Sequence, residues 1–518
     1  MDPKEFRRIG HETVERIAQF YEQLAAQGLE QSDGTSGSTS SLGVPAPIPR
    51  IPVLSQVQPG YLATLIPSEA PETPEPWSAI SSDIEQKIMP GITHWQSPNF
   101  FAFFPSNSSF PGILGEMYSA MFNSIGFNWQ TSPAYTELEQ IMCNWLAKAI
   151  GLGDAFLSSS TSSLTDGRPQ LGGGIIQGSA SEAIVVAIIA ARQKMIDALK
   201  TDETDDAAMA VAGKLIAYGS TQTHSATKKG AMIAGVRFRA LEVDPVTFSL
   251  HGETVTAAIQ EDLANGLIPF YITATIGTTS SGAVDDIPGI VQAASEYNVW
   301  VNVDAAWAGS ALVCAEYRHL LAGVDGVDSF SFNMHKWMLT NFDCSPMWVK
   351  NRKYLTNALS ISPAFLRNAA SSSGLITDYR DWQLPLGRRF RSLKIWFVVR
   401  TYGLEGIRAH IRKHIQQCII FENHLLARPN LYKIVTQRSL ALITFSIVPP
   451  SESKWSANDL TNAVCDAINA DGEILVTHTV LNGVDVIRFV PGGTLTTDAH
   501  IVGACRVFDR VTAHVLSQ

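Results

Sequence analysis

The sequence predicts an α/β fold, with a mixed, mostly parallel β-sheet in a large domain and a smaller α+β domain after it. Between about residues 171 and 350, short apolar segments alternate with helical ones. Near-continuous apolar strands that alternate with helices are typical of a parallel sheet covered on both faces. Hydrophobic residues make up 45% of the 518 residues, which is ample for a sizeable core.

The chain opens with a predicted helix. Asp2 can cap it, and Pro3 suits its first position. Apolar residues then recur at steps of three and four, which indicates an amphipathic helix; these residues are Phe6, Ile9, Ile17, Phe20, Tyr21 and Leu24. Polar residues 31–43 and 158–170 are predicted to form a linker and a surface loop, and proline-rich residues 67–77 an extended connector.

Further elements follow from the apolar pattern. Strands are predicted at residues 214–220, 267–277, 299–306 and 345–350, and helices at 179–199 and 285–298. After about residue 394, shorter segments end in "VDVIRFVPGG" and a final helix, which indicates the smaller α+β domain. We therefore expect three parts, residues 1–109, 110–393 and 394–518.

Composition limits the class of protein. The net charge of −10, from 38 basic and 48 acidic residues, argues against a nucleic-acid partner. Six scattered cysteines without a C-x-x-C pair are typical of a reduced cytoplasmic protein. The first residues lack the apolar core of a secretory signal, and the apolar run at 183–191 is too short to span a bilayer. We expect a soluble cytoplasmic protein with no membrane partner.

Four chemically distinctive features lie at predicted strand ends or loops, where ligands of such sheets bind. The segment "GSASEA" (178–183) opens a helix, so its N–H groups and hydroxyls can hold a phosphate, or Ser179 can be an ordinary helix cap. His224 follows one predicted strand and Asp304 ends another. Lys336 follows "GVDSF", the predicted end of a buried strand. Each has an ordinary alternative: a surface or core histidine, a helix cap, and a surface lysine.

The four features together fit one ligand, pyridoxal phosphate. Its phosphate suits the helix N-terminus, its pyridinium nitrogen suits a carboxylate, and its aldehyde suits a lysine amine. A histidine ring can stack on the pyridine face. Burying a lysine costs free energy unless it is paired, neutral or covalently used, and the cofactor supplies that use for Lys336. The spacing "HIRKH" of His410 and His414 lacks the Glu of H-E-x-x-H, so no metal site is predicted.

Several longer motifs carry a specific resemblance. The segments "SFNMHKW", "NVDAA", "GSASEA", "THWQSPNFFAFFP", "NFDCSPMWVK" and "GLITDYRDWQLPLGRRFRSLK" resemble those of group II pyridoxal-phosphate decarboxylases. The branch is that of aromatic-L-amino-acid decarboxylase and aromatic acetaldehyde synthase. The resemblance extends from the N-terminal helix into the C-terminal domain and is weakest after about residue 430 and in the two polar segments.

The resemblance implies a fold-type I, aspartate-aminotransferase-like architecture. It also implies an obligate homodimer with shared active sites, in which residues 1–109 clasp the partner. By motif, Lys336 forms the Schiff base, Asp304 pairs with the pyridinium and His224 stacks on the ring. The implied phosphate site and its surroundings comprise Ser179, Ala180, Ser181, Asn333 and His335, with Thr275 and Ala306 nearby.

The resemblance also implies a substrate pocket. Trp95, Phe103, Phe104 and Pro105 line it, Ile125 and Phe127 reach in from the partner subunit, and Gly387 adjoins it. Phe103 stands where the family commonly has tyrosine, so one pocket hydroxyl is lost. Aromatic walls favour an aromatic amino acid. Glycine at 387 implies room for an indole, which favours tryptophan and leaves phenylalanine, tyrosine and DOPA open.

Phe365 is the departure with the largest chemical consequence. It lies in the segment matching the family's mobile catalytic loop, where decarboxylases carry a tyrosine. The tyrosine hydroxyl is implied to help protonate Cα, and general acid catalysis of this kind contributes roughly 10²–10⁴-fold. Its loss implies reaction with O2 as co-substrate, giving an aromatic acetaldehyde, CO2, ammonia and hydrogen peroxide, as in aromatic acetaldehyde synthases.

Three alternatives stay open. In a simple decarboxylase, water or His224 supplies the proton and Phe365 only anchors the loop. A catalytically silent regulatory paralogue is a second alternative, although Lys336, Asp304 and His224 are all present. An aminotransferase on the same cofactor is a third, and the family resemblance disfavours it.

Overall fold

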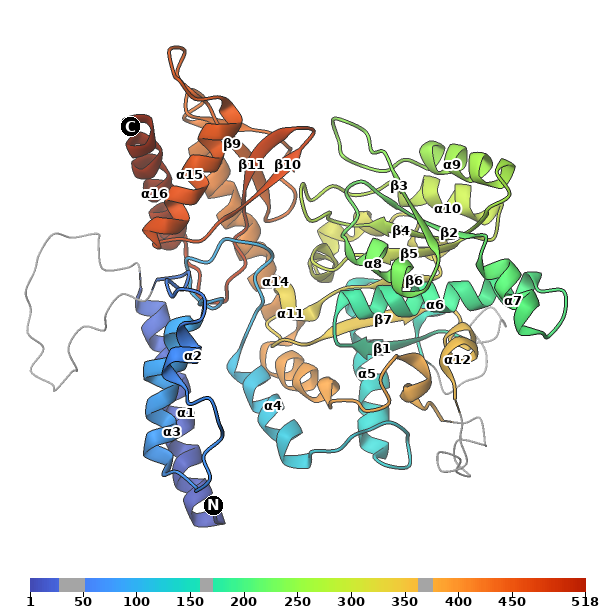
Figure 1. Ribbon diagram of the computed structural model, residues 1–518, viewed down its shortest axis with the longest axis horizontal. Coiled ribbons are helices and arrows are strands. Elements are labelled where there is room, and N and C mark those ends of the chain that lie inside the picture. Colours follow the sequence, from blue (N-terminus) through green and yellow to red (C-terminus); the bar gives the residue numbers. More distant parts are fainter. Residues whose placement is uncertain (28–51, 159–170, 362–375) are drawn as a thin grey trace, which may run out of the picture. The chain divides into compact units, whose positions relative to one another are not determined.

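The computed structural model describes residues 1–27, 52–158, 171–361 and 376–518 (Figure 1). The chain forms two compact units. The terminal unit comprises Met1–Pro105, Gln416–Val435 and Ile443–Gln518, and the central unit comprises Ser106–Ile415 and Thr436–Leu442. The three-part division at residues 109 and 393 stays a prediction. The predicted linker at 31–43, nearly all of the predicted loop at 158–170, and Phe365 lie outside the described residues.

A seven-stranded sheet forms the centre of the central unit, in the order β1-β7-β6-β5-β4-β2-β3. The strands are β1 (Gly173–Gln177), β2 (Leu215–Ser220), β3 (Arg237–Leu241), β4 (Ile268–Thr275), β5 (Trp300–Asp304), β6 (Ser329–Ser331) and β7 (Ser345–Val349). Only β7 among them runs antiparallel to its neighbours, β1 and β6. The predicted mixed, mostly parallel sheet is confirmed.

Helices surround this sheet (Figure 1). Those of the central unit are α4 (Phe110–Phe122), α5 (Pro133–Ile150), α6 (Ala180–Leu199), α7 (Asp205–Ala212), α8 (Ala226–Ile233), α9 (Gly252–Ala264), α10 (Ile287–Ser295), α11 (Met334–Trp337) and α12 (Lys353–Leu359). α6 packs against the sheet and against α8 and α12, and Ile184, Val186 and Ile188 are fully buried. This packing explains why its sequence is apolar almost all round.

The terminal unit is the smaller α+β part. Its antiparallel sheet has the order β10-β11-β9-β8, with β8 (Tyr432–Ile434), β9 (Ile443–Ile447), β10 (Thr477–Leu481) and β11 (Val484–Phe489). Its helices are α1 (Pro3–Ala26), α2 (Tyr61–Leu65), α3 (Trp77–Asp83), α15 (Ala457–Asp471) and α16 (Asp498–Leu516). The predicted cap is confirmed, because the Asp2 carboxylate accepts hydrogen bonds from Lys4 N and Glu5 N, each 2.8 Å long.

One long helix, α14 (Arg391–Leu426), belongs to the central unit in its first part and to the terminal unit after Ile415. Its backbone leaves helical geometry at Gly403, where φ is 62°. A left-handed φ of this kind favours glycine. Across residues 1–27, 52–158, 171–361 and 376–518, no helix is long and apolar enough to cross a membrane.

Close backbone packing between α9 and α10 yields a first prediction. A Cβ at Gly252 would lie 2.4 Å from the carbonyl carbon and oxygen of Gly289. We expect Gly252→Ala to lower the free energy of unfolding by about 1–3 kcal/mol, because backbone cannot yield as a side chain does. Urea unfolding followed by circular dichroism measures it.

Gly213→Ala is the matched control. Gly213 has helical backbone angles, and its added Cβ would meet only Met209 O, at 3.5 Å. We expect little change in stability there. Equal losses in both variants would contradict the close packing of α9 on α10.

Candidate active site

The carboxyl ends of three neighbouring strands place three polar residues side by side. In the registers of β4, β5 and β6, Thr275 pairs with Asp304, and Asp304 pairs with Ser331. Asp304 is 4% exposed, and its Oδ1 accepts a hydrogen bond from Ala306 N at 2.9 Å. The hydroxyls of Thr275 and Ser331 are buried and find no hydrogen-bond partner within the described chain. Because buried polar groups normally have partners, this edge is suited to a polar ligand.

Lys336 lies on α11, directly after β6, and is half-buried. Its backbone N–H donates to Asn333 O at 3.1 Å, and Asn333 N donates to Ala306 O at 2.9 Å. The Asn333 side chain accepts a hydrogen bond from Ser345 Oγ at 2.7 Å. These bonds fix the lysine-bearing turn to the loop that follows Asp304 and to the start of β7.

His224 follows β2 and precedes α8. Its Nδ1 accepts a hydrogen bond from Ala226 N at 3.1 Å, so the neutral ring carries its proton on Nε2. The residue as a whole is exposed to solvent. Partial desolvation lowers the pKa of His224, while Asp304 raises it and Lys336 lowers it further. Both charges therefore lie within electrostatic range of the ring, and the three predicted residues converge.

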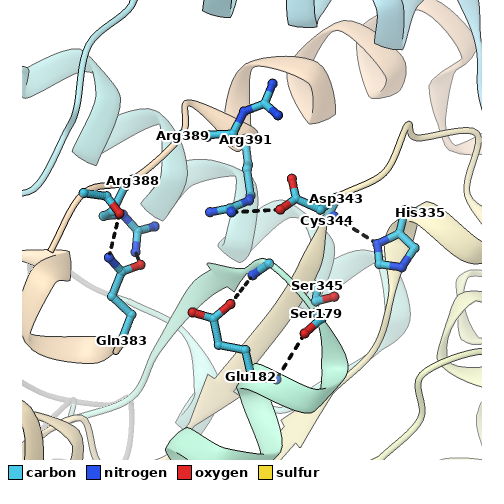
Figure 2. Close-up of polar contacts among 12 residues, drawn as sticks. Ser179, Glu182, His335, Asp343, Cys344, Ser345, Gln383, Arg388, Arg389 and Arg391 are labelled. Carbon is cyan, nitrogen blue, oxygen red and sulfur yellow. Dashed lines mark hydrogen bonds and ion pairs between the residues drawn. The ribbon is translucent and has the colours of Figure 1, made fainter. Parts of the chain in front are cut away.

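His335 is a buried, neutral hydrogen-bond acceptor and donor. Its Nδ1 accepts from Cys344 N at 2.9 Å, which leaves an N–H at Nε2 (Figure 2). Burial, followed by the charge of Lys336, lowers the pKa of His335 to about 4. The imidazole therefore stays neutral near neutral pH and can donate one hydrogen bond to an anion.

The N-terminus of α6 is where the sequence predicts an anion site. Ser179 caps the helix, and its Oγ accepts from Glu182 N at 3.2 Å, while Glu182 Oε2 accepts from Gly178 N at 2.9 Å (Figure 2). The N–H groups of Ala180 and Ser181 meet no acceptor among the described residues. They point along the helix dipole, which favours a negative charge.

Strand pairing connects this helix end to the lysine-bearing turn. Gln177, just before Gly178, pairs with Ser345, whose hydroxyl donates to Asn333. On the other side, a Cβ at Gly178 would lie 3.2 Å from Asp343 Oδ2. Asp343 forms an ion pair with Arg391 and accepts its hydrogen bond at 2.9 Å (Figure 2). The residues predicted to hold phosphate thus belong to adjoining segments.

The aromatic residues predicted to bind substrate lie in the terminal unit. Trp95 and Phe103 stack at 5.6 Å between ring centroids, and Phe103 is 50% exposed. Arg488, which the sequence did not single out, donates to Phe103 O at 3.3 Å and lies 5.0 Å from the Phe104 ring centroid. Burial lowers the pKa of Arg488 to about 10. Pro105 packs against Gly492, where an added Cβ would lie 3.2 Å from its ring.

The other predicted substrate residues lie together in the central unit. A Cβ at Gly387 would lie 3.3 Å from Ile125 Cγ2, and the next residue, Arg388, donates its N–H to Ile125 O at 2.8 Å. Phe127 O accepts a hydrogen bond from Arg380 N at 3.3 Å. Residues 125–127 and 380–388 therefore run beside each other, although 250 or more residues separate them in the sequence.

Two histidines that support α11, His410 and His414, were not predicted from the sequence to belong to this site. Trp337 Nε1 donates to His414 Nδ1 at 3.0 Å, and His410 Nε2 donates to Asn107 Oδ1 at 3.1 Å. Asn107 N in turn donates to His335 O at 2.7 Å. The four-residue spacing of the histidines was the available signal, and it indicates two histidines on one helix face that support the lysine-bearing turn.

The basic segment "GRRFRSLK" has its charges paired within the chain. Arg388 pairs with Glu139, Arg391 with Asp343, and Lys394 with Glu116. The side chain of Arg388 is 0% exposed, so its charge is balanced by a buried carboxylate on α5.

Comparison with known proteins gives the family. Residues 59–448 match the pyridoxal-dependent decarboxylase conserved domain. The chain belongs to the pyridoxal-dependent decarboxylase family. It is 44% identical to tryptophan decarboxylase 2 of Oryza sativa subsp. japonica, over 100% of this chain and 96% of that one. It is also 43% identical to phenylacetaldehyde synthase of Arabidopsis thaliana, over 100% of this chain and 97% of that one.

A solved structure of the family has the same fold. The crystal structure of Oryza sativa TDC with PLP and tryptamine superposes with a TM-score of 0.90 at 33% identity, covering 100% of this chain and 99% of that one. The predicted fold-type I architecture and the predicted decarboxylase family are confirmed. Relatives in this pyridoxal-dependent family include both decarboxylases and acetaldehyde synthases.

The neutral state of His335 predicts a dependence of stability on pH. The pKa in the folded protein is about 4, below the value of about 6.5 in an unfolded chain, so between these values the unfolded chain binds the extra proton. The neutral ring makes its full contribution to the free energy of unfolding above about pH 6.5. That contribution is lost as the pH falls toward 4, at up to about 1.4 kcal/mol per pH unit.

His335→Gln provides the comparison, because an amide oxygen can accept from Cys344 N without titrating. Urea unfolding of both proteins at about pH 7.5 and about pH 5 measures the difference. We expect the variant to lose less stability on acidification. Equal losses in the two proteins would show that His335 is not held neutral.

Proposed function

We propose that this chain uses pyridoxal phosphate to decarboxylate aromatic L-amino acids and to convert them, with O2, into aromatic acetaldehydes. The observation that carries the choice of product is Phe365, which stands where the family's decarboxylases carry a loop tyrosine. The family match and the convergence of Lys336, Asp304 and His224 support the choice of cofactor.

The residues at the strand ends fit the chemical groups of that cofactor. The N–H groups of Ala180 and Ser181 and the Nε2–H of His335 are donors suited to a phosphate. Asp304 is a buried carboxylate suited to a pyridinium nitrogen. The buried hydroxyls of Thr275 and Ser331, which have no partner among the described residues, flank it. When bound, the cofactor supplies an aldehyde that bonds to an amine and a ring that accepts electrons as CO2 leaves.

Each residue then has a defined task. The Lys336 amine would hold the aldehyde of the bound cofactor. Asp304 keeps a proton on the ring nitrogen, because a buried carboxylate strongly favours the cation beside it. His224 covers a ring face and excludes water from it. His335 and the first turn of α6 orient the phosphate and so fix the position of the reacting carbon.

Phe365 decides what happens at Cα after CO2 leaves. A tyrosine hydroxyl there would donate a proton to Cα, a contribution of roughly 10²–10⁴-fold. Phenylalanine keeps the ring but cannot donate a proton, so Cα would stay open to reaction with O2. The balanced reaction is amino acid, O2 and H2O giving aldehyde, CO2, NH3 and H2O2. Two electrons pass from the substrate carbon to O2, which is reduced to peroxide.

The second candidate is simple decarboxylation to the arylalkylamine. The similarity to a tryptophan decarboxylase favours it, and His224 offers an N–H at Nε2 as an alternative proton source. The third candidate, a catalytically silent paralogue, is disfavoured because Lys336, Asp304 and His224 are all retained.

Aromatic side chains are the proposed substrate class, with tryptophan first. The stacked pair Trp95 and Phe103 exposes flat ring surface, which suits an aromatic substrate. Gly387 adds no side chain beside Ile125, which suits a two-ring indole. The relatives named for tryptophan, tyrosine and phenylacetaldehyde support the class.

A homodimer in the cytoplasm is the proposed state. One face of α4 and the turn after it expose large apolar side chains, which a stable partner surface would cover; they are Phe110, Leu114, Met117, Tyr118, Met121, Phe122 and Ile125. All six cysteines are buried free thiols, which suits a reducing compartment.

Product analysis under air tests the proposed reaction. Purified protein is given L-tryptophan, L-phenylalanine, L-tyrosine and L-DOPA, and amine, aldehyde and peroxide are quantified together. We expect aldehyde and peroxide in equal amounts from the wild type. Phe365→Tyr restores the proton donor, so amine should become its main product.

Phe365→Leu is the matched control, because it changes the ring but adds no hydroxyl. Its product should remain the aldehyde, at whatever rate the loop allows. Amine alone from the wild type would contradict the synthase proposal and leave a decarboxylase. Turnover of none of the four amino acids would overturn the proposed function altogether.

A further inference from the structure

A fully buried ion pair connects β1 to the turn 383–388 in the central unit. The side chains of Glu139, on α5, and Arg388 are both 0% exposed and form a direct ion pair. The Glu139 oxygen that binds Arg388 also accepts from Ile176 N, in β1, at 2.8 Å. β1 leads directly to Gly178 and the first turn of α6. The pair is therefore fixed to the strand that carries the proposed phosphate site.

Gln383 extends this pair toward the proposed substrate side. Arg388 Nη1 donates to Gln383 Oε1 at 2.6 Å, as Figure 2 shows. The Gln383 amide nitrogen donates to Pro385 O and, at 3.4 Å, to Gly387 O. The guanidinium also lies 4.7 Å from the ring centroid of Tyr379. The side chains of Arg388 and Gln383 thus close the turn 383–388 on itself.

The backbone of the same turn holds the proposed substrate residues. Arg388 N donates to Ile125 O at 2.8 Å, and Gly387 lies so close to Ile125 that an added Cβ would be 3.3 Å from its Cγ2. Desolvating an ion pair is costly, and a hydrophobic replacement is often at least as stable. A buried network with many backbone partners instead favours one backbone arrangement. Here that arrangement is the placement of Gly387 against Ile125.

We propose that Gln383, Arg388 and Glu139 are positioning residues that set the depth of the aromatic side-chain site at Gly387 and Ile125. They thereby set the preference between two-ring and one-ring amino acids. The proposal rests on the aromatic substrate class proposed above. One methylene more or less of a substrate in a hydrophobic pocket changes discrimination by roughly 10–200-fold, so a small shift of this turn should give a measurable change.

Gln383→Met is the deciding variant. It keeps the length of the side chain and the Glu139–Arg388 pair, and it removes the hydrogen bonds to Arg388, Pro385 and Gly387. The measurements are kcat and KM for L-tryptophan and L-tyrosine, the dissociation constants of tryptamine and tyramine, the cofactor absorbance and Tm. We expect the tryptophan-to-tyrosine ratio of kcat/KM to fall about 10-fold or more, mainly through KM for tryptophan.

Gln417→Met is the matched control. Gln417 is also a buried glutamine, and its amide donates to Thr496 O at 3.3 Å and Asp498 Oδ1 at 3.2 Å in the terminal unit. It loses comparable hydrogen bonds without touching the turn, so its ratio should match the wild type. Arg388→Lys keeps the charge but not the planar fork, and its ratio should fall as in Gln383→Met.

The proposal is overturned if Gln383→Met folds, binds the cofactor and behaves like the wild type in both measurements. These are the tryptophan-to-tyrosine ratio of kcat/KM and the ratio of the dissociation constants of tryptamine and tyramine. If Gln383→Met does not fold, the same two ratios measured for Arg388→Lys decide whether the proposal holds. The amine affinities separate this proposal from the proposed function. If the wild type binds both amines but turns over no amino acid, only the proposed reaction is contradicted. If it binds neither amine, the proposed reaction and the positioning role are both contradicted.

Discussion

The parallel register of β4, β5 and β6 is the constraint on which the site depends. It places the last residues of these strands on one edge, so Asp304 lies between Thr275 and Ser331 without any long side chain reaching across. The carboxylate is buried and the two hydroxyls have no partner in the described chain. Such an edge is suited to a polar group that pairs with these hydroxyls and the carboxylate, and the family's cofactor has groups of that kind.

Polar groups behind this edge hold the reactive segment. α11 has only four residues, too few to be stable alone, so its position depends on its surroundings. His414 accepts from Trp337, Asn107 binds the backbone of His335, and Asn333 bridges to Ala306 and Ser345. Burial lowers the pKa values of His335 and His410, so these rings act as uncharged hydrogen-bonding groups. Rigid support of this kind keeps a lysine amine in one place.

Local patterns in the sequence predicted the fold well. The cap at Asp2, the strand ending at Asp304 and the helix opening at Ser179 each depend on a few neighbouring residues, and the structure has all three. The buried network was not predictable, because Arg388 and Glu139 lie 249 residues apart and their charges suggest a surface. The terminal unit combines segments from both ends of the chain, and local patterns in the sequence do not reveal contacts over such a separation. The role of Phe365 is inferred from its motif alone, since it lies outside the described residues.

The central claim is that Lys336 is the residue that holds the cofactor. Reduction of the cofactor-bound protein with borohydride, followed by proteolysis and mass spectrometry, tests it directly. The account predicts loss of the yellow colour and a pyridoxyl group on the peptide that contains "SFNMHKWM", attached to Lys336. Attachment to another lysine, such as the buried Lys394, or no attachment in a protein reconstituted with cofactor, would contradict it.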